Sequence, residues 1–480
     1  MICSRYSIIT FIRIITSIIF WGTVSANCIA QTKSSGIDTL MQTLSKRGQF
    51  NGSILIAEHG KVIYENGLGK ADIKNNIDFT PATPCYLASL SKQFTAMAVM
   101  ILTEQKKLSY SDLLYKYFPE LPAYAQKITI RNLLNHTSGI PDYVELGLEH
   151  PGLTDKEVLD FLTHKDSLGF LPGDKFEYSN SNYVLLALII EKVSSQTYSS
   201  FLEKYIFHPL QMNHTFVKDE THPEIPGKAV GYNRFGDIDD YDLLTYGEGG
   251  IYSTVEDFFK WDQALYTNKL VKQSTLREAF TPAKLNNGNL SDYGFGWVLV
   301  DFNGELTTMH AGRYGGFNTY IKRFPREENM IIFLTNHDFK NMNEIANPLT
   351  DILYGKPYAL PKLSIAEIMF RIYKSKSRDS ALQRYHYLKR TNDTTYDYRE
   401  SELNELGYEL MGMKKLKDAI EILKLNVEEY PASANVYDSL GEAYLKDGNK
   451  ELSIKNYEKS LKLNPNNENA KEVLKKLKVG

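Results

Sequence analysis

Hydrophobic residues recur with two different periods in this chain, and the two patterns occupy separate stretches. From Gly52 to Gly69, two short apolar runs (ILIA and KVIY) flank the polar turn Glu58-His59-Gly60, an arrangement that predicts a β-hairpin. A helical pattern follows, in which apolar residues stand three and four positions apart from Phe94 to Leu102. This spacing predicts an amphipathic helix with one buried face.

Strand-like patterns return near residue 296, after a loop-rich and helical stretch that ends near residue 265. Four apolar runs follow one another there: GWVLVDF, ELTTMH, FNTYIKRF and MIIFLT. The first two are separated by Asn303-Gly304, the strongest short hairpin signal in a sequence. Because both ends of this region are β and its middle is helical, we expect an α+β fold. The two ends would form one antiparallel sheet, covered by the helical middle.

Strand patterns end after Gly355-Lys356-Pro357, and a period of 34 residues appears further on. The pair Leu406-Gly407 recurs as Leu440-Gly441, and Leu423 recurs as Tyr457. This period and spacing are typical of the tetratricopeptide repeat, in which each repeat is a helix–turn–helix. The sequence therefore predicts an all-α repeat domain at the C-terminal end.

An earlier helix pair carries a degenerate form of the same pattern and holds Ala381 and Tyr385. We therefore place a first domain at residues 31–357 and the tetratricopeptide-like domain at residues 358–480. Helical repeats of this kind stack into extended surfaces that bind other proteins. The repeat domain is thus expected to offer a surface to a possible protein partner.

The first thirty residues have the parts of a secretory signal. Arg5 and Arg13 precede an apolar run over residues 14–24, and small residues lead to Ala30. A retained membrane anchor is disfavoured, because a spanning helix needs roughly 20 apolar residues. Lipidation of Cys28 is a third interpretation. We expect a signal peptide at residues 1–30 that directs the chain to the bacterial periplasm or the exterior, with membrane association if Cys28 is lipidated.

Composition narrows the classes of function. Hydrophobic residues make up 42% of the chain and charged residues 24%, as in ordinary soluble globular proteins. The net charge of −3, without a basic block, argues against a nucleic-acid partner. Three cysteines, Cys3, Cys28 and Cys85, are too few for a disulfide framework or a cysteine zinc cluster. The histidines lack a metal-ligand spacing such as HExxH, so no metal or cofactor is expected.

The first candidate motif is Ser89-Leu90-Ser91-Lys92, at the start of the predicted helix. Residues three apart on a helix share a face, so Ser89 and Lys92 are expected within reach of each other. A serine hydroxyl becomes a good nucleophile when a neighbouring base takes its proton. A lysine can be that base when burial or charge keeps it neutral. By itself, this four-residue pattern is also common on protein surfaces.

Two further motifs follow along the chain. Tyr178-Ser179-Asn180 precedes an apolar helical run; a tyrosine beside a lysine ammonium is favoured as a phenolate, and Asn180 offers a donor and an acceptor to a substrate amide. His310-Ala311-Gly312 ends the predicted strand ELTTMH. Its glycine lets a substrate backbone lie against the strand, and His310 would face the acyl group as a donor or partial cation. Taken alone, the second motif could equally be a helix-capping pair. The third motif, taken alone, could equally contain a histidine with a structural role.

In this order, the three motifs resemble those of the serine β-lactamase and penicillin-binding protein superfamily. The second motif is similar to the Tyr-x-Asn of AmpC-type β-lactamases, D,D-carboxypeptidases, D-aminopeptidases and related esterases. Further stretches agree: LLNHTSGIPDY at 133–143, FEYSNSNYVLLALII at 176–190, GEGGIYSTVEDFFKW at 247–261 and YGFGW at 293–297. The resemblance spans about residues 37–355 and implies a β-lactamase/transpeptidase-like antiparallel sheet with a helical subdomain.

The resemblance also implies an acyl-enzyme mechanism. Ser89 would attack an ester or amide, Lys92 and Tyr178 would manage the proton, and water would release the acyl group. The backbone amides of Ser89 and Arg313 would form an oxyanion hole. Substrate contacts are implied for Asn180, His310 and Gly312.

One departure from the resemblance concerns the third motif, where classical members carry a lysine that binds the substrate carboxylate and this chain has His310. A histidine with an ordinary pKa of ~6.5 is mostly neutral at pH 7, so its attraction for a carboxylate is weaker. This disfavours β-lactam hydrolysis and favours an esterase or peptidase-like role. We also expect protonation near that pH to change the preference among substrates.

A second class of function stays open at this point. The chain could be a catalytically idle, penicillin-binding-like protein that serves as a binding or scaffold module through its repeats. The presence of Ser89, Lys92, Tyr178 and Asn180 together favours an active serine hydrolase instead. The sequence leaves the substrate open among β-lactams, D-amino-acid peptides and small esters.

Overall fold

The computed structural model describes residues 32–234, 236–338 and 341–479. The chain divides into two compact units, one ending at Leu360 and the other beginning at Pro361. The expected signal peptide, with Cys3 and Cys28, lies outside the described residues. Within them, no helix is both long and apolar enough to cross a membrane.

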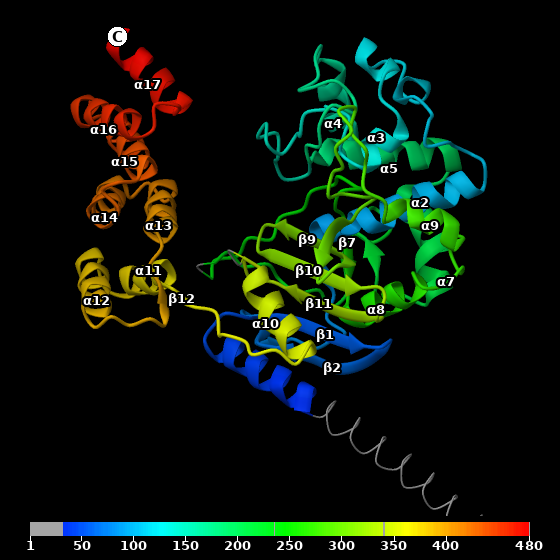
Figure 1. Cartoon of the computed structure of the whole chain (residues 1–480), viewed down its shortest axis with the longest axis horizontal. Helices are drawn as coiled ribbons and strands as arrows, with labels where there is room; N and C mark the ends of the chain where they lie inside the picture. The colour runs from blue at the N-terminus through cyan, green and yellow to red at the C-terminus, as the bar shows by residue number, and fades with distance from the viewer. Residues whose placement is uncertain (1–31, 235, 339–340, 480) are drawn as a thin grey trace, which may run out of the picture. The chain divides into compact units, whose positions relative to one another are not determined.

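Six strands form one antiparallel sheet in the first unit, in the order β2-β1-β11-β10-β9-β8 (Figure 1). The pairing of Ile54 with Phe333 joins the N-terminal hairpin to the last strand, so the sheet is built from both ends of the unit as the sequence predicts. The strands are β1 (Gly52–Glu58), β2 (Lys61–Leu68), β8 (Val298–Phe302), β9 (Glu305–Tyr314), β10 (Phe317–Phe324) and β11 (Asn329–Thr335).

Both faces of the sheet are buried at β1, which explains why the run from Ile54 to Ala57 is apolar without interruption. Ile54 and Ile56 point into one hydrophobic cluster, whereas Leu55 and Ala57 point into another, as the two-residue period of a strand requires. The first cluster also contains residues of the helix over 32–46 and of α10 (Asn343–Leu353). Figure 1 shows this helix in dark blue and α10 in yellow beside β1.

The other cluster contains the helical middle of the unit, centred on α2 (Lys92–Glu104). Every residue of α2 from Lys92 to Leu102 is buried. The helix is therefore enclosed on all sides, by α5 and α9 among others, and does not have the single buried face expected from its spacing. The other helices of this region are α3 (Ile130–Leu134), α4 (Asp155–Thr163), α5 (Asn180–Ser194), α6 (Tyr198–Leu202), α7 (His208–Leu210), α8 (Val255–Ala264) and α9 (Gln273–Ala279).

Short strands tie distant loops of this region together. β5 (Cys85–Tyr86) pairs with β7 (Ile251–Ser253), which also pairs with β6 (Phe216–Val217). This small sheet brings the segment before Ser89 next to the loop that ends at Gly250. A further small hairpin consists of β3 (Lys70–Asp72) and β4 (Ile77–Asp78).

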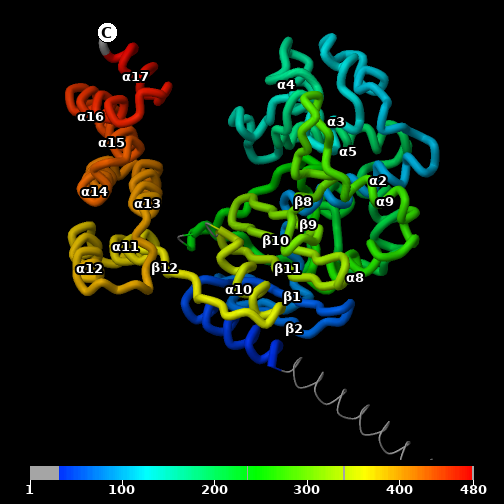
Figure 2. The backbone as a smooth tube through the Cα atoms, viewed as in Figure 1, coloured from blue at the N-terminus to red at the C-terminus, as the bar shows by residue number. Residues whose placement is uncertain are grey.

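The second unit is helical, apart from one short parallel pairing of β12 (Leu363–Ser364) with β13 (Tyr396–Asp397). The first helix packs on the second and the third, each later helix packs on the one before it, and the chain can be followed from yellow to red in Figure 2. The helices are α11 (Ile365–Ser375), α12 (Arg378–Arg390), α13 (Glu400–Gly412), α14 (Leu416–Glu429), α15 (Ala434–Lys446), α16 (Lys450–Leu463) and α17 (Glu468–Val479).

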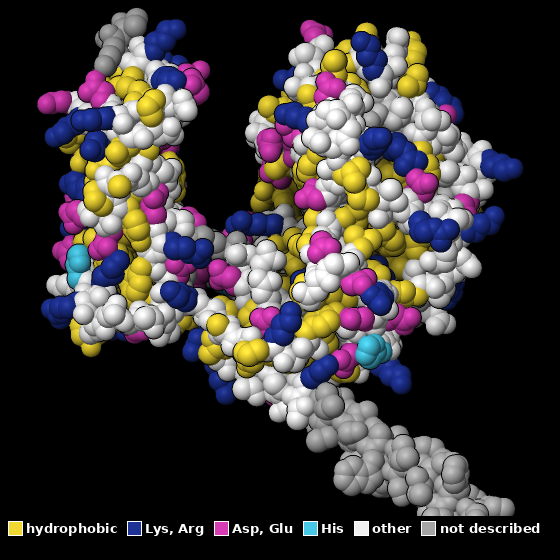
Figure 3. All heavy atoms as spheres, in the orientation of Figure 1, with side chains coloured by type: hydrophobic (Ala, Val, Ile, Leu, Met, Phe, Trp, Pro, Cys, Tyr) yellow, Lys and Arg dark blue, Asp and Glu magenta, His cyan; other side chains and the backbone are white. Residues whose placement is uncertain are grey.

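The 34-residue period has a direct physical basis in this unit. A Cβ added to Gly407 would lie 2.6 Å from the Leu423 side chain, and one added to Gly441 would lie 3.1 Å from that of Tyr457. Each glycine thus lets the two helices of its repeat approach closely, and the apolar partner 16 positions later fills the contact. Charged side chains of both signs are interspersed on the face of each unit drawn in Figure 3.

Candidate active site

The proposed nucleophile lies on a tight turn that continues directly into α2. Ser89 belongs to the 3₁₀ turn η1 (Ala88–Ser91), and it is half-buried while Leu90 and Ser91 are buried. Ala88 has a φ of +48°, a left-handed conformation that costs a non-glycine residue about 1 kcal/mol or more. Such conformations cluster at active sites, and this one directly precedes the serine.

Lys92 is completely buried, and its ammonium contacts three oxygen acceptors. Nζ lies 3.0 Å from Ser89 Oγ, 2.8 Å from Asn180 Oδ1 and 3.2 Å from the backbone oxygen of Glu248. These bonds use all three protons of an ammonium group. Burial lowers the pKa of Lys92 to about 7, and the carboxyl groups of Glu248 and Asp142 oppose that shift. Neutral and charged lysine are therefore both populated near pH 7.

This balance gives Ser89 a base within hydrogen-bond reach. A neutral Lys92 retains two N–H groups for Asn180 Oδ1 and the Glu248 carbonyl, and its lone pair can accept the proton of the Ser89 hydroxyl. A nucleophile and a base at this separation are the geometric requirement for covalent catalysis by serine. The predicted proximity of Ser89 and Lys92 is thus present in the structure.

Tyr178 lies in the extended segment before α5, with its ring centroid 4.9 Å from Lys92 Nζ. Burial raises the pKa of its phenol well above the usual range, although Ser89 close by lowers it somewhat. Its hydroxyl has no partner among the described residues at hydrogen-bond distance and angle. The expectation of a phenolate is therefore wrong, because desolvation and the charges of Asp142 and Glu248 all raise the pKa of this phenol. Tyr178 is a neutral donor beside the nucleophile.

Asn180 is the first residue of α5 and connects two charged groups. Its Oδ1 accepts from Lys92, and its Nδ2 donates to Asp142 Oδ2 at 3.0 Å. The side chain therefore orients the lysine and couples it to a buried carboxylate. Its expected contact with a substrate amide stays a prediction.

His310 is buried on β9 and both of its ring nitrogens have partners. Nδ1 lies 2.8 Å from the Ala311 carbonyl and Nε2 lies 2.9 Å from Tyr293 Oη. Because a carbonyl can only accept, Nδ1 carries the proton and Nε2 accepts from Tyr293. Burial and the nearby Lys92 lower the pKa of His310 to about 3, against a smaller opposing effect of the Ala311 bond. The expected titration of His310 near pH 6.5 is therefore wrong.

Gly312 allows β9 to approach the nucleophile turn. A Cβ at this position would lie 2.3 Å from the Leu87 carbonyl oxygen and 3.1 Å from the Ser89 nitrogen. Thr319 on β10 completes the contact, because its hydroxyl donates to the same Leu87 carbonyl at 2.7 Å. In the structure, then, Gly312 is a packing requirement next to Ser89.

The backbone of Arg313 is oriented by the strand pairing. β8 pairs with β9 only as far as Met309, so the edge of β9 beyond that residue is uncovered by β8. Arg313 is opposite Asn318 on β10, one position before the Tyr314–Phe317 pair that closes a two-residue turn. Backbone groups alternate in direction along antiparallel strands, so the Arg313 amide points towards this edge. The register thus directs the Arg313 amide to the uncovered edge, and its partnership with the Ser89 amide in an oxyanion hole stays a prediction.

Several residues at the site have no role in the sequence interpretation. The ring of His136 lies 4.3 Å from that of Tyr178, and its Nδ1 accepts from the backbone amide of Ser179 at 3.2 Å. Glu248 and Asp142 provide the charges that act on Lys92. All three residues lie within the stretches of sequence that resemble the family, so that resemblance was the signal that could have identified them. Among the residues described, no group of three or more histidine, cysteine, aspartate or glutamate side chains could hold a metal ion.

A buried lysine beside a serine at the start of a central helix, next to an antiparallel sheet, is the arrangement expected of the serine hydrolase class of proteins. Comparison with known proteins agrees with this class. The family model described as "Beta-lactamase" matches residues 37–356, and a tetratricopeptide repeat model matches residues 434–467. The chain therefore belongs to the β-lactamase family and carries a tetratricopeptide repeat near its C-terminus.

Individual relatives place the chain among penicillin-binding protein homologues. It is 32% identical to Penicillin-binding protein 4* of Bacillus subtilis (strain 168) over 81% of this chain and 90% of that protein. Its fold is similar to that of the octameric penicillin-binding protein homologue from Pyrococcus abyssi (TM-score 0.60, 28% identity, 71% of this chain and 81% of that one). It is also similar to D-amino acid amidase from Ochrobactrum anthropi SV3 (TM-score 0.57, 26% identity, 68% of this chain and 98% of that one).

Proposed function

We propose that this protein is an exported serine hydrolase that forms an acyl-enzyme on Ser89 from an ester or amide substrate. One observation carries the proposal: the hydroxyl of Ser89 lies 3.0 Å from a buried lysine whose pKa is about 7. At this pKa the lysine can take the serine proton and return it within the physiological range.

The reaction proceeds in two balanced steps. In acylation, the Ser89 proton moves to Lys92, Oγ bonds to the acyl carbon, and the leaving group departs with a proton from Lys92. In deacylation, water gives a proton to Lys92 and its oxygen bonds to the same carbon; the bond from that carbon to Oγ breaks, and Lys92 returns the proton to Ser89. The amides of Ser89 and Arg313 stabilise the oxyanion in both steps. Tyr178 donates a hydrogen bond to the leaving group, while the proton itself comes from Lys92.

The charges at the site favour substrates without a carboxylate beside the scissile bond. His310 is neutral because its pKa is about 3, so it does not attract an anion. The carboxyl groups of Asp142 and Glu248 interact electrostatically with Lys92 and would repel one. A neutral ester or an amino-acid amide fits this field better than a penicillin, and similarity to a D-amino acid amidase is consistent with such a substrate. Peptidoglycan-like peptides that end in a free carboxylate are less favoured by the same field.

Cellular placement is part of the same proposal. Residues 1–30 have the composition of a secretory signal, so the hydrolase would act in the periplasm or outside the cell, with membrane association if Cys28 is lipidated. The repeats of the second unit would bind a protein partner there.

Labelling with a fluorophosphonate probe tests this function. Mass spectrometry of the digested protein should show one adduct, on the peptide holding Ser89, and Ser89→Ala should lose both adduct and ester turnover. Because that peptide also contains Ser91, which is buried in the same turn, Ser91→Ala is the matched control and should keep the adduct.

Substrate class follows from a panel of p-nitrophenyl esters, D-alanyl amides and nitrocefin. The esters or amides should be turned over faster than nitrocefin. A wild-type protein that reacts with neither probe nor substrates would support the idle binding module instead.

A further inference from the structure

The loop between Thr245 and Gly250 contains a buried carboxylate that the reaction scheme does not use. Glu248 gives its backbone oxygen to Lys92 at 3.2 Å, while its side chain turns to the phenol of Tyr143. Tyr143 Oη donates to Glu248 Oε1 at 3.0 Å. The other oxygen, Oε2, is buried and makes no hydrogen bond to a described residue. A fully buried carboxylate with few hydrogen-bond donors is costly, so the presence of this group requires an explanation.

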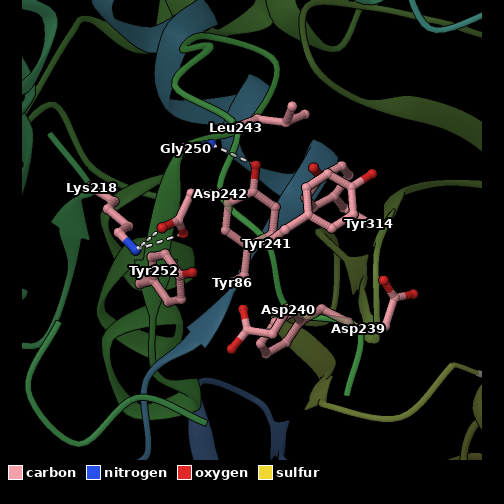
Figure 4. Close-up of a pocket in the computed structure, with 11 residues that line it drawn as sticks. Tyr86, Lys218, Asp239, Asp240, Tyr241, Asp242, Leu243, Gly250, Tyr252 and Tyr314 are labelled. Carbon is pink, nitrogen blue, oxygen red and sulfur yellow. Dashed lines mark hydrogen bonds and ion pairs between the residues drawn. The ribbon is translucent and has the colours of Figure 1, made fainter. Parts of the chain in front are cut away.

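The Glu248 carboxylate is not needed to anchor the loop, because other hydrogen bonds hold the backbone on both sides of this residue. Thr95 of α2 donates to the carbonyl of Gly247 at 2.6 Å, and the amide of Gly250 donates to Tyr86 Oη at 3.0 Å. Figure 4 shows the second bond at the edge of a small pocket, where Lys218 also pairs with Asp242. The carbonyl of Glu248 is thus positioned by its neighbours, independently of its carboxylate.

The groups that face Lys92 differ in whether they carry a charge that stabilises its ammonium form. The rings of Tyr178 and Tyr183 lie 4.9 and 5.6 Å from Nζ, and neither phenol is ionised because burial raises both pKa values. Burial and the charge of Lys92 itself keep His136 and His310 neutral by lowering their pKa. Of the described residues, the charges that stabilise the ammonium come from the carboxyl groups of Glu248 and Asp142.

These two carboxyl groups are not equivalent. Both oxygens of Asp142 already accept hydrogen bonds, from the Val144 amide and the Asn180 side chain. Glu248 has the stronger effect on Lys92 and an oxygen without a hydrogen bond. Burial raises the pKa of Glu248, whereas Lys92, Thr245 and Tyr143 lower it. Asp155 lies behind it, and burial together with the charge of Glu248 raises the pKa of Asp155.

We propose that Glu248 is a positioning residue for the reaction at Ser89: its buried carboxylate, held by Tyr143, is the counter-charge that lets Lys92 accept and retain the serine proton during acylation. The inference rests on the proposed acyl-enzyme function. Without this charge, Lys92 keeps only the weaker effect of Asp142, so it releases its proton more readily and becomes a weaker base.

The pH dependence of acylation separates charge from structure. In wild type, kcat/KM for p-nitrophenyl acetate should rise with pH to a plateau, with a midpoint near pH 7. Glu248→Gln keeps an oxygen for Tyr143 and removes the charge. The midpoint of the Glu248→Gln variant should move to lower pH. If it moves by ~1 unit, the ratio of the rate at pH 6 to the plateau rate is about fivefold higher than in wild type. The plateau itself should fall a few-fold because a weaker base accepts the proton less well.

Two control variants keep the charge. Tyr143→Phe removes the hydrogen bond to Oε1, and Glu248→Asp shortens the side chain; both should move the midpoint less than Glu248→Gln does. Glu248→Ala repeats the charge removal if the glutamine variant does not fold. An unchanged midpoint in folded Glu248→Gln, or unfolding of both uncharged variants, would overturn the proposal. Absence of a Ser89 adduct in wild type would instead refute the proposed function, so the two failures are distinguishable.

Discussion

Replacing Lys92 with methionine should change how stability depends on pH, and the structure sets the size of the effect. Burial lowers the pKa of Lys92 from 10.5 to about 7 in the folded protein, whereas the unfolded chain keeps the ordinary value. Between these two pH values the unfolded state binds more protons, so wild-type stability rises with pH. The contribution is fully present above pH 10.5 and is lost as the pH falls to about 7.

The magnitude follows from the slope of this linkage. Each unit of pH changes the free energy of unfolding by at most ~1.4 kcal/mol per proton. Below pH 7 the buried lysine therefore costs on the order of 5 kcal/mol compared with strongly alkaline conditions. Lys92→Met keeps an unbranched side chain and lacks the titration. Between pH 7.5 and 9.5, wild type should gain about 2–3 kcal/mol relative to the variant.

Tryptophan fluorescence during urea denaturation measures this difference in the first unit alone. The chain has three tryptophans; Trp261 and Trp297 are buried in the first unit, and the sequence beyond residue 360 contains none. Tyrosines such as Tyr178 titrate in both proteins, so their effect cancels in the comparison. A stability difference that does not change between pH 7.5 and 9.5 would refute the desolvation argument for Lys92.

Two further predictions concern the third motif. Because His310 stays neutral, the ratio of kcat/KM for an anionic ester to that for a matched neutral ester should remain flat from pH 8 to 5.5. His310→Lys should raise this ratio across the range. A ratio that rises at low pH in wild type would contradict the assigned proton positions. Gly312→Ala should destabilise the first unit by about 1–3 kcal/mol and reduce Ser89 labelling at least ~100-fold, because its Cβ would lie 2.3 Å from the Leu87 oxygen. Gly36→Ala, whose Cβ would meet Ile352 at an ordinary 3.5 Å, is the control and should leave labelling unchanged.

Local patterns predicted the elements that depend on local chemistry. The hairpin of β1 and β2, the four C-terminal strands and the paired helices of the repeats all follow from periodicity and turn residues. The enclosure of α2 was not predictable in this way, because spacing shows one apolar face and cannot show that further elements cover the others. Gln93 and Thr95 of α2 are buried, and their partners come from other elements: Trp261 donates to Gln93 Oε1, and Thr95 donates to the Gly247 carbonyl.

The positions of Ser89, Lys92 and Asn180 could likewise be inferred from motif order, but not their protonation states. Motif order does not show that the Ala311 carbonyl fixes the proton on His310 Nδ1, which leaves Nε2 to accept from Tyr293. Glu248 lies 156 residues from Lys92 along the chain, and no spacing rule connects them.

The sequence by itself therefore determined the α+β sheet, the repeat unit and the residue types available for acyl transfer, because hydrophobic period, turn chemistry and motif spacing are properties of neighbouring residues. The tertiary structure decided the electrostatics. It buried Lys92 between neutral rings, brought the carboxyl groups of Glu248 and Asp142 into electrostatic interaction with it, and fixed His310 as a neutral ring. Desolvation and Coulomb interactions act through space, so the chemistry of these groups is set by partners that only folding brings together.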